Sequence, residues 1–142
     1  MSDVSQFWRP CDSPPPPVTA EEIDDWQADF GVCLPVTLAR ALMVQNGGAV
    51  RDSAIEIEAL TEFTPLDDEQ WEGVWTDDQT IGADRSRQFH IGESVGVGVI
   101  LDYSAGTEPR ILLLHHNVGR ELRDHGIRSF EELLATTRHD GN

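Results

Sequence analysis

Apolar residues recur at helical spacing soon after the start of the chain. Ile23, Trp26 and Phe30 recur at helical spacing and are expected to form the buried stripe of a helix. Thr19 precedes this run and can cap the helix N-terminus, and Glu22 three residues later completes a capping box. Gly31 can adopt the left-handed conformation that ends a helix. The pattern predicts a first helix between Thr19 and Gly31.

Two further helices are predicted, one shortly after the first and one near the end of the chain. Pro35 opens the second helix, and residues 46–48 (Asn-Gly-Gly) are expected to stop it, because glycine accepts the positive φ of a C-terminal cap. Ser129 is a second N-cap, and Glu132 completes its capping box. Phe130 begins the apolar face of this last helix.

Between these helices the hydrophobic pattern changes to that of strands. Apolar and acidic residues alternate over residues 55–59, as expected for a strand with one wet face. Residues 88–91, 95–103 and 110–116 are further strand candidates, and the last two are expected to pair as an antiparallel hairpin. Because residues 111–114 are all apolar, this strand should be central and covered on both faces. The fold class predicted is α+β, a mostly antiparallel central sheet with helices from both chain ends packed against it.

The length of 142 residues predicts one domain. Residues 14–17 are all proline, which favours extended backbone, so residues 1–17 are interpreted as a flexible proline-rich tail. Phe7 and Trp8 within it can fold back onto the body. The domain itself is placed at residues 18–138, with a C-terminal tail at residues 139–142.

The charge of the chain is strongly acidic and unevenly distributed. There are 26 acidic residues and 10 basic ones, a net charge of −16, and every basic residue is arginine. Residues 1–80 hold 17 acids and 3 arginines (−14), and residues 81–142 hold 9 acids and 7 arginines (−2). Such a field repels nucleic acid and anionic membranes and attracts basic proteins. Plain solubility is an alternative reason for the charge.

The sequence predicts a cytoplasmic protein. Cys11 and Cys33 are the only cysteines, which is no disulfide framework and fits a reducing compartment. Residues 1–5 lack the apolar core of a signal peptide, and no apolar run is long enough to span a membrane.

No pattern in the chain predicts catalysis, a cofactor or a metal. Gly92, Gly96 and Gly98 do not have the spacing of a phosphate-binding loop, and glycine inside a strand usually marks a bulge or a close backbone approach. Neighbouring strand residues point to opposite faces, so His115 and His116 cannot chelate one ion together. Without a nucleophile elbow or a second ligand at metal spacing, we expect no enzyme activity.

The segment from Leu66 to residue 78 is the best candidate for a binding surface. It combines many acids with two tryptophans and has no basic residue. Indole rings can anchor a partner in its pockets while carboxylates bind arginine or lysine. The alternative is a solvated loop with both tryptophans in the core, and the sequence leaves the two interpretations evenly matched. The candidate residues are Asp67, Asp68, Glu69, Trp71, Glu72, Trp75, Asp77 and Asp78.

Four short motifs follow one another along the chain: Leu34-Pro35, Asn46-Gly47-Gly48, Gly92 and Gly96 before Leu101-Asp102, and Ser129-Phe130 with Leu133-Leu134. In this order they resemble the SUKH superfamily of Smi/Knr-type domains, and its bacterial immunity proteins in particular. The resemblance covers roughly residues 18–136, whereas residues 64–80 match no family pattern and residues 95–98 are more apolar than the turn expected there.

The resemblance implies a non-enzymatic binding domain, often paired with a secreted nuclease or other toxin. An acidic protein suits that role, because it can occlude a basic nucleic-acid cleft. The leading hypothesis is therefore a cytoplasmic immunity protein that uses residues 67–78 and the acidic face of the first helix. A scaffold or regulatory protein is the main alternative, and a small hydrolase or ligand-binding enzyme is the other.

Overall fold

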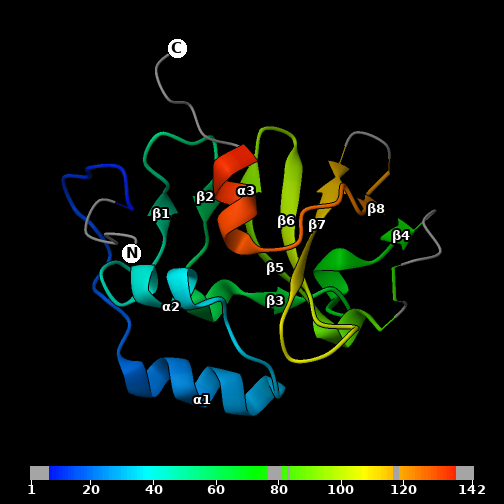
Figure 1. Cartoon of the computed structure of the whole chain (residues 1–142), viewed down its shortest axis with the longest axis horizontal. Coiled ribbons are helices and arrows are strands. Elements are labelled where there is room, and N and C mark those ends of the chain that lie inside the picture. The colour runs from blue at the N-terminus through cyan, green and yellow to red at the C-terminus, as the bar shows by residue number, and fades with distance from the viewer. Residues whose placement is uncertain (1–6, 77–80, 83, 117–118, 137–142) are drawn as a thin grey trace.

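The computed structural model describes residues 7–76, 81–82, 84–116 and 119–136 (Figure 1). They form an α+β fold with an eight-stranded sheet in the order β1-β2-β5-β6-β7-β8-β4, and β3 pairs separately with β5. Every strand pair is antiparallel except β4 with β8. The helices are α1 (Ala20–Phe30), α2 (Val36–Leu42) and α3 (Phe130–Thr136), with 3₁₀ helices η2 (Leu60–Glu62), η3 (Glu69–Trp71) and η4 (Arg85–Arg87), and the strands are β1 (Gly48–Ala49), β2 (Glu56–Ile57), β3 (Thr64–Pro65), β4 (Trp75–Thr76), β5 (Gln88–Ser94), β6 (Val97–Asp102), β7 (Arg110–His115) and β8 (Glu121–Arg123).

The caps of α1 are those that the sequence predicts. Thr19 and Glu22 form the reciprocal capping box, and Gly31 ends the helix in the left-handed conformation at φ 66°. The cap of α3 is related but shifted. The Ser129 hydroxyl accepts the Glu132 N–H, whereas the Glu132 carboxylate accepts the Arg128 N–H and so binds one residue earlier than in a capping box.

The prediction that Asn-Gly-Gly stops the second helix is wrong. The helix α2 ends at Leu42, and the Leu42 carbonyl accepts the N–H of Val18, so a segment from outside the helix satisfies this end. Asn46 instead lies in the following turn, where its side chain accepts the Leu60 N–H at 2.8 Å. Gly47 has φ 99°, and a Cβ there would lie 3.0 Å from the backbone of residues 58 and 59.

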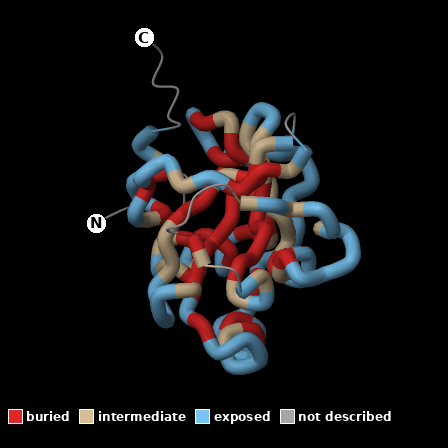
Figure 2. Tube along the Cα trace, turned by 90° about the vertical axis from the view of Figure 1, so that its right-hand side faces the viewer, coloured by how far each residue is buried: buried red, intermediate tan, exposed pale blue. Residues whose placement is uncertain are grey.

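The central position predicted for residues 110–116 is confirmed. The strand β7 lies between β6 and β8, and its apolar residues enter clusters on both faces of the sheet. Ile111 faces the larger cluster, which α1, α2 and α3 cover, and Leu112 and Leu114 face the smaller one. Figure 2 shows the buried trace running through the middle of the molecule with exposed segments around it.

Two aromatic residues near the N-terminus fold back onto the body. Trp8 is buried in the larger cluster, and its indole N–H donates to the Ala41 carbonyl at 2.8 Å. Phe7 packs edge-on against Trp8 and stacks on Phe130. Residues that precede the proline run therefore contribute to the same core as the helices.

Candidate partner-binding surface

The acid-rich segment crosses the outside of the smaller apolar cluster, from β3 to the edge strand β4. Leu66 anchors it in that cluster, and the Asp68 carboxylate caps η3 by accepting the Gln70 N–H at 3.2 Å. Of the predicted binding residues, Asp77 and Asp78 lie outside the described residues. The segment is thus ordered by its own turns and by apolar contacts beneath it.

The carboxylates of this segment face solvent. Asp67, Asp68, Glu69 and Glu72 are all exposed. The ion pairs found within the described part of the chain use other carboxylates, those of Glu93, Asp102, Glu121 and Asp124. The segment therefore presents negative charge that the fold does not neutralise by contact.

The two tryptophans of the segment have different environments. Trp71 is half-buried; its ring lies against the His90 ring at 4.4 Å between centroids with a tilt of 33°, and its indole N–H donates to the Thr64 hydroxyl. Trp75 lies on β4 at the end of the sheet order and is 46% exposed. Neither sequence interpretation describes both rings: Trp71 packs inward, and Trp75 is free to contact another molecule.

Arg120 is a residue of this surface that the sequence interpretation missed. Its guanidinium donates to the carbonyls of Gln70 and Glu72 at 2.8 and 3.0 Å, and it lies over the Trp71 ring at 5.7 Å from the centroid. Its φ of 65° is unusual for a residue other than glycine. Because Arg120 is about fifty positions away in sequence, no local pattern indicates this contact.

Histidines lie beneath the segment as structural groups. His90 is buried and hydrogen-bonds to Glu93, which also contacts His116. A Cβ at Gly98 would lie 3.0 Å from the His90 ring, so this glycine permits the close approach that its place in a strand predicts. His115 instead contacts His125, and burial together with that second ring lowers the pKa of His115.

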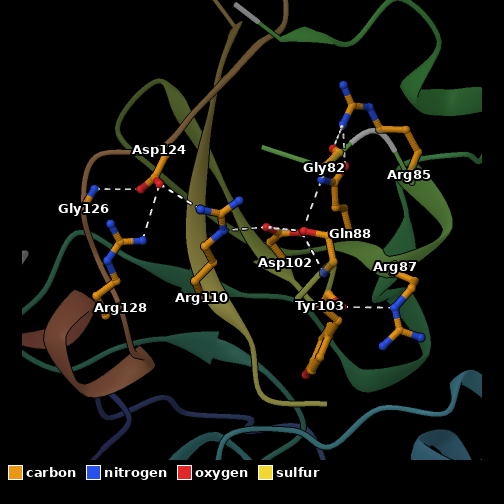
Figure 3. A network of polar contacts seen from close by, with 11 residues as sticks. Gly82, Arg85, Arg87, Gln88, Asp102, Tyr103, Arg110, Asp124, Gly126 and Arg128 are labelled. Carbon is orange, nitrogen blue, oxygen red and sulfur yellow. Dashed lines mark hydrogen bonds and ion pairs between the residues drawn. The ribbon is translucent and has the colours of Figure 1, made fainter. Parts of the chain in front are cut away.

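A second polar network lies beyond the acidic segment and centres on Asp102 (Figure 3). The buried Asp102 carboxylate accepts hydrogen bonds from Arg110, Gln88 and Ser104. Arg110 also pairs with Asp124 at 3.0 Å, which ties the ends of β6 and β7 to the turn before α3. Asp102, part of the Leu-Asp motif, thus has its hydrogen-bonding capacity used within the fold.

A hollow of about 350 Å³ lies between the starts of α2 and α3. Leu34, Pro35, Val36, Pro109 and Phe130 supply most of its apolar lining. Over the described ranges, no group of three or more His, Cys, Asp or Glu side chains could hold a metal ion. Nor does any helix in those ranges have the length and apolarity needed to cross a membrane.

Comparison of the chain with protein-family models, with curated proteins and with solved structures finds no match. The resemblance to SUKH domains therefore stays a prediction from the sequence motifs.

The acidic face of α1 is a separate surface from the acidic segment. Ile23 and Trp26 pack α1 against the larger apolar cluster, whereas Leu66 and Trp71 pack the segment against the smaller one, on the other face of the sheet. The two acidic regions named in the leading hypothesis are therefore independent candidates for a contact.

Proposed function

We propose that this protein is a non-enzymatic binding domain that neutralises a basic partner protein in the cytoplasm, and that the partner is a nuclease toxin. The observation that carries the proposal is a set of exposed carboxylates that form no ion pair with another described residue, in the same segment as the exposed Trp75. A nuclease holds its polyanionic substrate with arginine and lysine, and an ordered acidic surface can occupy the same groups. The resemblance to immunity proteins supports the same function.

The geometry of the segment favours tight binding over loose attraction. Arg120 and Asp68 hold the backbone of η3 in place before a partner arrives, so less conformational entropy is lost on association. Trp75 supplies the rigid aromatic contact that often dominates binding energy. We assign recognition to Trp75 with Asp67, Glu69 and Glu72, and we assign Trp71 to positioning.

Affinity capture from the native cell lysate tests this proposal. The full chain is immobilised, bound proteins are washed with rising salt, and the retained proteins are identified by mass spectrometry. We expect one basic protein, held at low salt and released only at high salt. Several weakly held proteins, or none, would contradict the immunity function, and several would favour the scaffold alternative.

Charge reversal then tests the surface. The variant with Asp67, Glu69 and Glu72 changed to lysine spares the Asp68 cap and should lose most of the binding. A control with Asp24, Asp25 and Asp29 of α1 changed to lysine alters net charge equally on the separate acidic surface. If both variants lose binding equally, the partner responds to the net charge of the protein and not to a particular surface. If only the α1 variant loses binding, α1 is the binding site. Trp75→Ala should weaken binding without changing its salt dependence.

A further inference from the structure

The outward face of α2 carries two exposed apolar side chains and one arginine, although this helix lies on the surface of a very acidic protein. Leu38, Ala41 and Leu42 point into the core. By helical spacing, the opposite side carries Val36, Arg40 and Met43. Val36 is 64% exposed and Met43 is 44% exposed. A solvated helix normally carries polar side chains at such positions, so this face has the composition of a contact surface.

This apolar face continues into the hollow between α2 and α3. Val36 belongs both to the outward face of α2 and to the lining of the hollow. The Thr37 hydroxyl donates to the Glu131 carboxylate at 2.6 Å, which places that carboxylate beside the helix. The exposed apolar side chain of Val36 is therefore continuous with the apolar lining of the hollow.

The charge of this region is balanced, unlike that of the whole chain. The helix α2 contains no acidic residue and one arginine, Arg40. Around the hollow lie Glu108, Arg128 and Glu131, so the region holds equal numbers of each sign while the chain has a net charge of −16. Two copies meeting at the acidic segment or at α1 would bring excess negative charge together, whereas two copies meeting here would not.

We propose that the outward face of α2 is a homodimer interface with a second copy of this chain. With the twofold axis perpendicular to α2, the two α2 helices run antiparallel, so Val36 of each copy packs against Met43 of the other. In this arrangement Arg40 of each copy lies on the same side of the helix pair as Glu131 of the other copy, so the two can form an ion pair across the interface. Because α2 covers the larger apolar cluster and the acidic segment covers the smaller one, the dimer leaves both acidic segments exposed.

Sedimentation velocity of the full chain over micromolar to submillimolar concentrations tests the dimer. We expect a reversible monomer–dimer equilibrium. Val36→Glu with Met43→Glu should raise the dissociation constant by about a hundredfold or more, since each residue enters the interface twice. The control is Val95→Glu, which adds one negative charge, against two in the double variant, at an exposed apolar position, 87% exposed, in the turn between β5 and β6.

A charge swap separates the proposed geometry from general hydrophobic association. Arg40→Glu should weaken the dimer, and adding Glu131→Arg should restore much of it. Circular dichroism confirms that each variant is folded. A monomer at every concentration, assembly beyond a dimer, or equal weakening by Val95→Glu would overturn the proposal. The proposal would also be overturned if replacing Val36 and Met43 abolished binding of the captured partner but left the oligomeric state unchanged.

Discussion

Replacing Asp102 by alanine should destabilise the fold without removing an exposed group. The carboxylate is buried and accepts the Arg110 Nε–H at 2.7 Å, the Ser104 N–H at 3.1 Å and the Gln88 amide at 3.3 Å. In the alanine variant these donors lose their acceptor, and the largely buried Arg110 guanidinium loses one of the two carboxylates that it contacts among the described residues. The Leu-Asp motif would then be a structural requirement of the sheet.

The size of the effect follows from what remains after the substitution. Breaking a buried ion pair by removing one partner costs about 3–5 kcal/mol. Arg110 keeps Asp124 at 3.0 Å, so we expect the lower end, about 3 kcal/mol. A chain of 142 residues has a free energy of unfolding of roughly 7–20 kcal/mol, so the variant still folds. Its Tm should fall by roughly 6–12 °C.

Urea unfolding followed by tryptophan fluorescence measures this loss, and an unchanged m-value shows that the same surface unfolds. Asp67→Ala, at an exposed carboxylate that pairs with no other described residue, is the matched control and should change stability by less than about 0.5 kcal/mol. Asp102→Ala combined with Arg110→Met should cost less than the sum of the single changes, because no isolated cation stays buried. A loss below about 1 kcal/mol for Asp102→Ala, or strict additivity in the pair, would refute the reasoning.

Three further predictions concern the rest of the fold. Gly92→Ala should lower the free energy of unfolding by about 3 kcal/mol or more, because the new Cβ would lie 2.2 Å from the Glu56 carbonyl oxygen. Urea unfolding measures this loss, and near-wild-type stability would contradict that packing. Trp8→Ala should cost about 3–5 kcal/mol by calorimetry, and a negligible change would mean that the residues before the proline run do not belong to the core. Tyr103 is the only tyrosine, and burial first, then the charge of the nearby Cys33, raises the pKa of its phenol above 10. Because the fold favours the neutral phenol, the free energy of unfolding should fall as pH rises above about 10. Absorbance at 295 nm should then show ionisation of Tyr103 only as the protein unfolds.

Local signals account for the parts of the fold that were predicted. Thr19, Glu22 and Gly31 interact within a few residues of each other, so the caps of α1 are readable from sequence. The run of apolar residues in β7 likewise indicates burial on both faces. The role of Asn46 was not readable, because its partner Leu60 is fourteen positions away and comes close only when β1 and β2 pair.

The two tryptophans show the same limit within the candidate site. Trp71 and Trp75 are equivalent as sequence features, since each lies in the same acidic segment. Their different exposure depends on the residues beneath them: His90 and Thr64 receive the Trp71 ring, whereas Trp75 lies on the last strand of the sheet. Only the tertiary fold decides which of the rings can contact another molecule.

The seven arginines of residues 81–142 do not neutralise the acidic first part of the chain. Several of these arginines are used inside the fold: Arg87 donates to the Tyr103 and Gly106 carbonyls, and Arg120 donates to backbone carbonyls of the acidic segment itself. Arg110 pairs with carboxylates of its own half. A partner that binds the acidic segment must therefore bring its own positive charge, and its affinity should fall as salt screens the exposed carboxylates.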